Sequence, residues 1–326
     1  MIEIRRRDFI ALIGGAAVAW PLAARAQLTA MPVIGYFSGR SPDAEAPLRM
    51  PFLKALEELG FTAGQNIAIE YRFSNGQDQR LPALAVELVR RDVAVLVATD
   101  TPSALAAKAA SSTIPIVFAT GTDPVKLGLV ESLNRPNTNA TGVAVFVSEL
   151  TPKRLQLLRE VVPGASLIAF VVNPNTPNGP PQIQEMQATA RAIGQQVLIL
   201  NASTEREVDE AFATIVERKA AAIVYATSVF FQVVHEQLVR LAARHAIPAI
   251  YEWPEFVRAG GLMSYSSHRA EAGPRIGNYT GRILKGAKPA DLPVFQSTKF
   301  DLVINMKTAK ALGLTIPPAC SPSPTR

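Results

Sequence analysis

The sequence predicts an α/β fold with two Rossmann-like lobes, each built on a parallel sheet. Short apolar runs rich in Val and Ile alternate with longer amphipathic segments, a pattern typical of parallel strands joined by crossover helices. The chain has 326 residues, which is long for a single hydrophobic core, and proteins of this length usually divide into two lobes or domains. The order of the predicted elements supports this fold class.

The first lobe is predicted to contain alternating strands and helices from residue 33 onward. Its first helix places Phe52, Leu56 and Leu59 on one face, and Gly60 is suited to end it. The stretch 134–139 is dense in turn formers and indicates the approach to a crossing between lobes. The expected order is strand 33–38, helix 47–59, strand 67–73, helix 81–91, strand 93–99, helix 103–111, strand 114–119 and strand 141–147.

The second lobe is predicted to repeat this alternation. The expected order is helix 152–161, strand 167–173, helix 182–193, strand 197–201, helix 205–219, strand 222–227, helix 231–245 and strand 248–252. The last of these strands is expected to return the chain toward the first lobe, which would then hold strand 262–266 and a helix that ends near Lys285. A final strand and helix within residues 299–312 are expected to rejoin the second lobe.

These expectations define the predicted domains. The first lobe comprises residues 31–145 and about 253–295, and the second comprises residues 146–252 and about 296–316. Residues 317–326 carry several prolines and few apolar side chains, so they are predicted to form a disordered tail.

The N-terminus is predicted to be an export signal, residues 1–26, that is cleaved near Ala26. Arginines at 5–7 precede an apolar stretch at 9–19, and small residues follow at 24–26. Arg6-Arg7 resembles the twin-arginine export motif, and an ordinary secretory signal is the alternative. The apolar stretch reaches about 16 Å as a helix, short of a bilayer core of about 30 Å. The mature protein is therefore expected in the periplasm.

Charge and cysteine content exclude several classes. The chain has 33 basic and 27 acidic residues, and removal of residues 1–26 takes away four arginines and two acids, which leaves a net charge of about +4. Because Lys and Arg form no basic stripe, nucleic acid is not an expected partner. Cys320 is the single cysteine, so no internal disulfide and no cysteine-based metal site can form.

The sequence contains no motif for catalysis or cofactor binding. It lacks the G-x-S-x-G elbow, the G-x-x-x-x-G-K-[ST] loop and a G-x-G-x-x-G fingerprint after the first strand. His235 and His245 share a predicted helix but are separated by roughly 15 Å along its axis, so they cannot share a metal, and His268 has no ligand partner at a suitable spacing. We therefore expect no enzyme activity, no metal and no cofactor.

Polar side chains occupy the loops that follow the predicted strands. In open parallel sheets ligands bind at the carboxyl ends of the strands, where helix N-termini present unpaired N–H groups. The carboxylate of Asp123 can pair there with a ligand ammonium group, or it can cap the segment 125–130. The same alternatives apply to Asp100, for which capping is favoured.

Aromatic residues at predicted strand ends border the expected cleft. They can sandwich a flat or apolar ligand, although each one alone is more often a core residue. These residues are Tyr36, Phe37, Tyr251, Trp253 and Tyr265.

Several sequence blocks are distinctive. They are TDPV at 122–125 with GLV at 128–130, IYEW at 250–253 with GGLMSY at 260–265, RILKG at 282–286 with KPADLP at 288–293, and KFDLVIN at 299–305 with TAKALGL at 308–314. In these blocks, and over about residues 32–318, the chain resembles the bacterial ABC-transporter substrate-binding proteins of the periplasmic binding protein type I fold. The branch it resembles includes tryptophan and tyrosine binders.

The resemblance implies a two-lobed protein with three crossings between the lobes, and we expect a monomer. Such a protein holds a small zwitterionic or aromatic molecule in the cleft and hands it to an ABC permease in the membrane. The ligand-binding residues that it suggests are Ser38, Thr101, Ser103, Thr122, Asp123, Asn173, Asn175, Thr227 and Ser228, with Tyr251 and Tyr265 as aromatic candidates.

Some positions depart from the family pattern. Pro254 stands where the family often has a charged residue, Ser266 stands where it has glycine, and the segment 268–277 is unusual. Because that segment begins beside the cleft, we expect the cavity wall there, and the ligand, to differ. Two other functions are open: a sensory partner of a membrane receptor kinase, and a secreted enzyme on the same scaffold.

Overall fold

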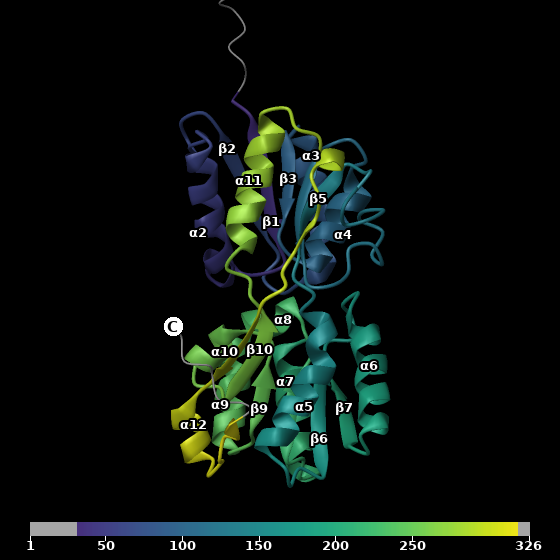
Figure 1. Ribbon diagram of the computed structural model, residues 1–326, viewed down its shortest axis with the longest axis vertical. Helices are drawn as coiled ribbons and strands as arrows, with labels where there is room; N and C mark the ends of the chain where they lie inside the picture. The colour runs from purple at the N-terminus through teal and green to yellow at the C-terminus, as the bar shows by residue number, and fades with distance from the viewer. Residues whose placement is uncertain (1–30, 319–326) are drawn as a thin grey trace, which may run out of the picture.

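The computed structural model describes residues 31–318, which form two lobes stacked along the long axis of the molecule (Figure 1). Each lobe contains a six-stranded sheet covered by helices on both faces, which confirms the predicted α/β fold. The predicted export signal (1–26), Cys320 and most of the predicted tail lie outside the described residues. Within the described residues, no helix is long and apolar enough to cross a membrane.

The first sheet has the order β11-β5-β4-β3-β1-β2, and all its strand pairs are parallel. Its strands are β1 (Val33–Ser38), β2 (Ala68–Phe73), β3 (Val95–Ala98), β4 (Ile116–Thr120), β5 (Ala140–Ala144) and β11 (Phe295–Gln296). Its helices are α2 (Pro42–Glu58), α3 (Leu81–Arg90), α4 (Thr101–Ala110) and α11 (Ala272–Leu284). The central strands are buried apolar runs, as a sheet covered on both faces requires.

Helices α2 and α11 pack tightly together on one face of this sheet (Figure 1). Glycines of α11 make the close approach possible: a Cβ at Gly273 would lie 2.5 Å from the carbonyl oxygen of Leu48, and one at Gly277 would lie 2.5 Å from that of Phe52. Because α11 comes from the C-terminal part of the chain, this packing holds residues 272–284 in the first lobe.

The second sheet has the order β12-β10-β9-β8-β6-β7 and is parallel except for β12, which runs antiparallel to β10. Its strands are β6 (Leu167–Val172), β7 (Gln196–Asn201), β8 (Ala222–Tyr225), β9 (Ala249–Tyr251), β10 (Met263–Ser267) and β12 (Phe300–Ile304). Its helices are α5 (Thr151–Val161), α6 (Gly179–Ala192), α7 (Glu205–Glu217), α8 (Val229–Val233), α9 (His235–Arg244), α10 (Pro254–Arg258) and α12 (Met306–Ala311).

The predicted placement of strand 262–266 in the first lobe is wrong. β10 pairs in parallel with β9, so it belongs to the second sheet. The short helix α10 connects the two strands within one βαβ unit, and the chain leaves the second lobe only after β10. The segment 268–271 is therefore the second crossing between the lobes, not part of the first-lobe sheet.

Two predicted helices also have different bounds. Helix α2 begins at Pro42, before the predicted start at 47, because Ser41 caps it by accepting a hydrogen bond from the backbone N–H of Ala44 at 3.3 Å. The predicted helix 231–245 is divided into α8 and α9, since the backbone leaves helical geometry at Val234.

The chain crosses between the lobes three times: between β5 and α5, between β10 and α11, and between β11 and β12. Hydrogen bonds tie neighbouring crossings together. The Ser267 hydroxyl donates to the carbonyl of Val145, and the Ser297 hydroxyl donates to the carbonyl of His268 at 2.9 Å. These crossings form the hinge, and the strand ends of the two sheets face each other beside it.

Candidate ligand-binding site

A cavity lies between the two lobes at the hinge. Its wall is built from loops at the ends of β1, β3, β4 and β8, from α2, and from the hinge segments after β5 and β10. Its volume is about 60 Å³. The apolar residues of its wall are Ala44, Leu48, Pro102, Ala119, Val145, Val147, Val229 and Ala272.

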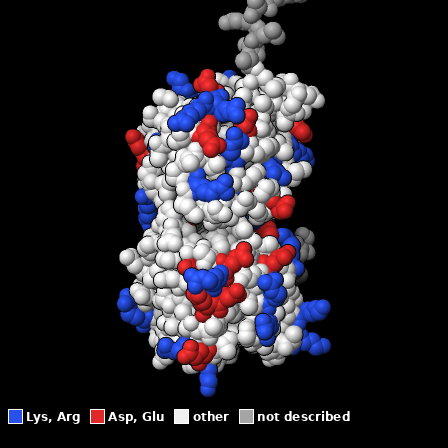
Figure 2. Space-filling model, turned by 180° about the vertical axis from the view of Figure 1, so that it is seen from behind, with Lys and Arg blue, Asp and Glu red and all other residues white. Residues whose placement is uncertain are grey.

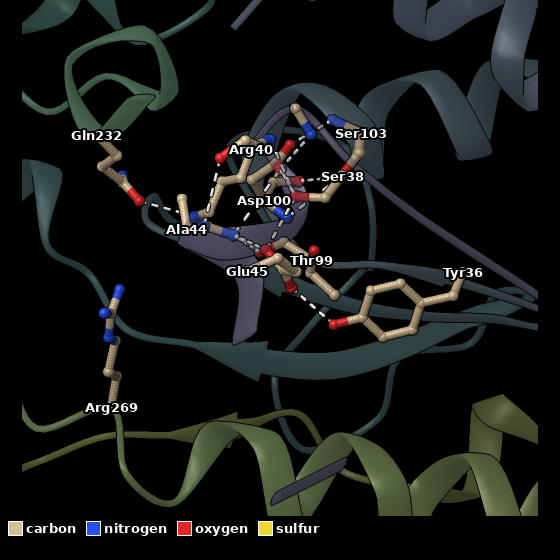
Figure 3. Close-up of polar contacts among 12 residues, drawn as sticks. Tyr36, Ser38, Arg40, Ala44, Glu45, Thr99, Asp100, Ser103, Gln232 and Arg269 are labelled. Carbon is tan, nitrogen blue, oxygen red and sulfur yellow. Dashed lines mark hydrogen bonds and ion pairs between the residues drawn. The ribbon is translucent and has the colours of Figure 1, made fainter. Parts of the chain in front are cut away.

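Arg40, which follows β1, organises the first-lobe wall (Figure 3). Its Nη1 donates to Glu45 Oε2 and to the carbonyl of Thr99, both at 2.9 Å, and lies 3.9 Å from Asp100 Oδ2. Its Nε donates to Gln232 Oε1 of the second lobe at 2.7 Å. Burial opposes the charge of Arg40, but the two adjacent carboxylates outweigh burial and raise its pKa. Arg40 is thus a charged link between the lobes.

Both carboxylates beside Arg40 already accept several hydrogen bonds. Glu45 Oε1 accepts from the Tyr36 hydroxyl at 2.6 Å, and its Oε2 lies 3.0 Å from Ser38 Oγ. Asp100 Oδ2 lies 2.8 Å from the same hydroxyl and accepts from a backbone N–H at 2.7 Å, that of Gly39. The proximity of Glu45 and the burial of the phenol raise the pKa of Tyr36, burial being the larger cause. The two carboxylates of this wall are therefore satisfied by groups of the protein itself.

Asp100 also caps helix α4. Its Oδ1 accepts from the backbone N–H of Ser103 at 2.9 Å, and the Ser103 hydroxyl oxygen accepts from the backbone N–H of Asp100 at 3.1 Å, which forms a capping box. The capping role favoured by the sequence is confirmed. Thr101 lies in the first turn of α4, lines the cavity, and accepts from the backbone N–H of Gly121 at 3.2 Å.

The second-lobe wall is held by Gln182 on α6. Its Oε1 accepts from the backbone N–H of Thr227 at 2.7 Å, and its Nε2 donates to the carbonyl of Thr227 at 3.1 Å. This pair of bonds fixes the loop after β8. The next residue, Ser228, lines the cavity with a buried hydroxyl that has no hydrogen-bond partner within residues 31–318. A bound molecule can supply that partner.

Trp253 and Arg269 form the wall beside the hinge. The guanidinium carbon of Arg269 lies 4.3 Å from the centroid of the Trp253 ring, and its Nη2 donates to Glu255 Oε1 at 2.5 Å. Burial lowers the pKa of Arg269, Glu255 opposes this, and the nearby positive charge of Arg40 adds to the lowering. The Trp253 indole N–H is buried and lacks a partner within the described residues.

A buried cation supports the hinge beneath the cavity. Arg154 on α5 is fully buried, and its Nη2 donates to the carbonyl of Val147 at 2.6 Å while its Nε donates to the carbonyl of Tyr265 at 3.0 Å. Burial lowers its pKa to about 10 although the nearby Glu252 opposes this. Glu252 is itself buried, and burial raises its pKa to about 7 against the influence of Arg154.

Three of the residues suggested by the resemblance line the cavity: Thr101, Thr227 and Ser228. Ser38 and Ser103 lie behind its wall, where they bind the carboxylate of Asp100. These five residues come from the ends of β1, β3 and β8, as the strand-end argument predicts.

The other suggested polar residues do not line this cavity. The Thr122 hydroxyl is 3.2 Å from Ser148 Oγ. Asp123 accepts from the backbone N–H of Val125 at 2.9 Å and so caps a turn instead of facing the ligand space. Asn173 and Asn175 line a separate groove between the lobes, beside α4.

The aromatic candidates pack elsewhere, apart from Trp253. Tyr251 stacks on Phe256 with ring centroids 4.8 Å apart and is fully buried in the second-lobe core. Tyr265 stacks on Phe300 at 6.0 Å. Tyr36 and Phe37 are buried in the first lobe, where Tyr36 reaches the cavity wall only through its bond to Glu45. Core packing thus accounts for Tyr36, Phe37 and Tyr251, whereas Tyr265 is partly buried at the edge of the second lobe.

The sequence reasoning missed Arg40, Glu45, Gln232 and Arg269. Arg40 and Arg269 follow the ends of β1 and β10, whereas Glu45 and Gln232 lie on α2 and α8. The strand-end argument selected small polar residues and so passed over these long side chains. The unusual segment 268–277 was the available signal for Arg269. Among the described residues, no three His, Cys, Asp or Glu side chains are grouped to hold a metal, and His268 instead lies 2.8 Å from Asp301 Oδ2.

Similar proteins share this architecture. A tyrosine-binding protein of Clostridioides difficile (strain R20291) is 29% identical over 264 residues, which cover 81% of this chain and 75% of that protein. A structure of an ABC domain from Streptococcus pneumonia in complex with L-Trp has 25% identity and a TM-score of 0.78, covering 89% of this chain and 97% of that one. A ligand-free, open substrate-binding protein with adhesive properties from Clostridium difficile has 28% identity and a TM-score of 0.61, covering 88% and 96%.

The family match spans most of the chain. Residues 41–326 match the family described as ABC transporter substrate binding protein, so the match includes both lobes and all three crossings. With the two parallel-sheet lobes and the cavity between them, this chain belongs to the ABC transporter substrate-binding proteins and has the periplasmic binding protein type I fold.

Proposed function

We propose that this chain is the solute-binding component of an ABC importer. It captures a small molecule between its lobes and delivers that molecule to an ABC permease in the membrane. The family supports this role, and the observation that carries it is a cavity whose wall is built from both lobes and the hinge. A ligand there touches both lobes, so its binding energy shifts the equilibrium from an open to a closed arrangement. The closed form is what the permease recognises.

The present arrangement of the lobes fits the ligand-holding state. The Arg40–Gln232 hydrogen bond spans the gap, and a Cβ added at Gly39 would lie only 3.0 Å from Val229 Cγ1 of the second lobe. The TM-score is 0.78 against the L-Trp complex and 0.61 against the ligand-free, open protein, over similar shares of the chain. Both observations support closure as the working motion.

The proposed ligand is an amino acid or a small aromatic compound. Two relatives are described with tyrosine and L-Trp as their ligands. In this chain the cavity combines apolar surface with buried hydroxyl and N–H groups that lack partners, which suits a small amphipathic molecule. We propose no chemical step on this ligand, because neither the sequence motifs nor the cavity supplies a nucleophile paired with a base.

The proposed site of action is the periplasm. Residues 1–26 would direct export and be removed near Ala26, by the twin-arginine or the general secretory route. Replacing both Arg6 and Arg7 with Lys tests the route: loss of export indicates the twin-arginine pathway, and continued export indicates the general one. We propose a monomer without a nucleic-acid partner, and on the face shown in Figure 2 basic and acidic side chains are interspersed over both lobes.

The proposed function is tested by ligand capture. The mature protein is purified, its cavity contents are identified by mass spectrometry after denaturation, and the released compound is titrated back by calorimetry. We expect saturable 1:1 binding, recovery of the unaltered compound, and a smaller radius of gyration in X-ray scattering. Conversion of the compound would instead support the enzyme alternative. A chain that binds none of the compounds from a broad panel of amino acids, organic acids, amides, amines and sugars would contradict the proposal.

A further inference from the structure

The polar groups of the cavity are unbalanced between donors and acceptors. Buried groups that lack partners within the described residues include the Trp253 indole N–H, which can only donate, and the hydroxyls of Thr99 and Ser228, which can donate or accept. All three side chains are nine-tenths or more buried, at 3%, 1% and 3% exposure. A buried donor left unpaired is costly, so the cavity favours a ligand that brings acceptors.

Arg269 adds charge to this set of donors. Of its guanidinium N–H groups, those on Nη2 donate to Glu255 Oε1, whereas Nε and Nη1 make no hydrogen bond within residues 31–318. Glu255 is also shared with a second cation, Arg258, whose Nη1 lies 3.2 Å from the same Oε1. One carboxylate thus faces two guanidinium groups. In Figure 3 the Arg269 side chain extends toward the side of the cavity where Ala44 and Gln232 lie.

The acidic residues of the cavity are, in contrast, fully engaged. Glu45 and Asp100 accept from Tyr36, Ser38, a backbone N–H and the N-cap of α4, and both lie near the positive charge of Arg40. A ligand ammonium group would have to displace these bonds. Asp123, the acid that the sequence offered for this purpose, does not line the cavity.

We infer that the ligand carries a carboxylate and that Arg269 is the residue that binds it. This inference rests on the proposed solute-binding function and specifies its ligand class: a small organic acid, with or without an α-amino group. A guanidinium fork matches the geometry of a carboxylate and can donate two parallel hydrogen bonds. The hydroxyl of Ser228 and the Trp253 N–H are further donors for the same or a second acceptor, and the apolar body lies against side chains such as Val145 and Leu48.

The experiment uses pairs of compounds that differ only in this group. Calorimetry compares carboxylic acids with their primary amides on the same apolar bodies: 3-phenylpropanoate with 3-phenylpropanamide, L-phenylalanine with its amide, and equivalent pairs with aliphatic and indole bodies. The best-binding acid is expected to bind at least about tenfold more tightly than its amide, since a hydrogen bond to a charged group is typically worth this much or more.

Two variants and a control assign the preference to Arg269. Arg269→Gln is expected to reduce the acid-to-amide ratio to below about threefold, and Arg269→Lys to retain part of it because the charge remains without the fork. Arg258→Gln is the matched control. The Arg258 side chain bonds to the same Glu255 oxygen but is 71% exposed and does not line the cavity, so this variant should keep the parent's acid-to-amide ratio. Circular dichroism melting shows that each variant is folded, and Arg269→Lys serves if Arg269→Gln does not fold.

The outcomes separate the inference from the function on which it rests. If amides bind as tightly as acids, or if both Arg269 variants keep the full preference, the carboxylate assignment is wrong while solute binding stands. If amines without a carboxylate bind best, the assignment is also wrong. If no compound of any class binds, the proposed function fails first.

Discussion

Arg40 Nε donates to Gln232 Oε1 at 2.7 Å across the space between the lobes. The guanidinium group is also held by Glu45 and by the carbonyl of Thr99, so it is fixed in the first lobe before the second lobe approaches. Gln232 lies on the short helix α8. The bond therefore forms only when the lobes close, and it ties closure to one glutamine amide.

Gln232→Ala is predicted to weaken ligand binding by favouring the open form. A hydrogen bond to a charged group contributes about 1.5–3 kcal/mol, so the apparent Kd should rise by about tenfold or more. Calorimetry gives the affinity, and X-ray scattering gives the radius of gyration with and without ligand. Gln237→Ala is the control, since Gln237 bonds only within the second lobe, to the carbonyl of Glu205 and to Asp209. Equal affinities for the two variants would show that the bond does not stabilise closure.

Gly39→Ala is predicted to oppose closure by steric contact. The added Cβ would lie 3.0 Å from Val229 Cγ1 of the second lobe and 3.3 Å from Asp78 Oδ1. Overpacking of this kind costs about 1–3 kcal/mol. If this cost falls on the closed form alone, Kd increases by about five- to 150-fold. Gly164→Ala is the control, because nothing lies within 4 Å of its added Cβ. The contact with Asp78 lies within the first lobe and remains when the lobes open, so the ligand-free protein is expected to melt at a slightly lower temperature. The expected signature of opposed closure is weaker binding beyond this small loss of stability.

The fold was predictable because the pattern that indicates it, apolar runs alternating with amphipathic segments, is repeated along the chain. Strand β1 and the strand-end residues Thr101, Thr227 and Ser228 follow from the alternation of apolar runs and helices, which is a local property of the sequence. The placement of β10 depends instead on which neighbour it pairs with. That choice is made by the short helix α10, which keeps β10 beside β9, and periodicity alone does not reveal it.

The cavity was less predictable because the orientation of its charged side chains depends on contacts that form only in the folded chain. Arg40 and Arg269 reach the ligand space through long side chains, and their orientation depends on partners such as Glu45 and Glu255 that are brought near by the fold. Arg154 resembles an ordinary exposed helix cation in the sequence, yet it is fully buried against the hinge. Burial of a charge is a property of tertiary packing and leaves no local pattern.

Arg154→Ala is predicted to destabilise the protein strongly. The change leaves the carbonyls of Val147 and Tyr265 without this donor and removes the cation that faces buried Glu252. Loss of one member of a buried charge pair typically costs about 3–5 kcal/mol. Urea unfolding measures the free energy, and Lys153→Ala, an exposed change on the same helix, should differ from the parent by less than about 0.5 kcal/mol. A small effect of Arg154→Ala would mean that water or another donor replaces the guanidinium at the hinge.

Glu252→Gln is predicted to change how stability depends on pH. Burial raises the pKa of Glu252 from 4.5 to about 7, with Arg154 opposing the shift. Below pH 4.5 both the folded and unfolded states hold the proton, and between pH 4.5 and 7 the unfolded state loses it first, so the parent protein loses stability as the pH rises through this window. A shift of this size corresponds to about 3 kcal/mol at most. The glutamine variant lacks this loss, so its stability relative to the parent should increase from pH 4.5 to 7 and then stay constant.

The measurement is urea unfolding of Glu252→Gln and of the parent at several pH values. The decisive quantity is the slope, against pH, of the difference between their free energies of unfolding. Arg154 stays charged throughout this window because its pKa is about 10, and its attraction to ionised Glu252 is already contained in the pKa of Glu252. Asp78 also has a pKa raised to about 7 by burial and by Asp100, but it is present in both proteins and cancels in the difference. Glu255→Gln is the control, because Arg269 lowers the pKa of Glu255 although burial opposes this. The stability that ionised Glu255 contributes is therefore lost only as the pH falls below about 4.5. The difference in unfolding free energy between Glu255→Gln and the parent should be constant from pH 5 to 8. A flat curve for Glu252→Gln as well would show that Glu252 is ionised throughout, and that Arg154 compensates its burial fully.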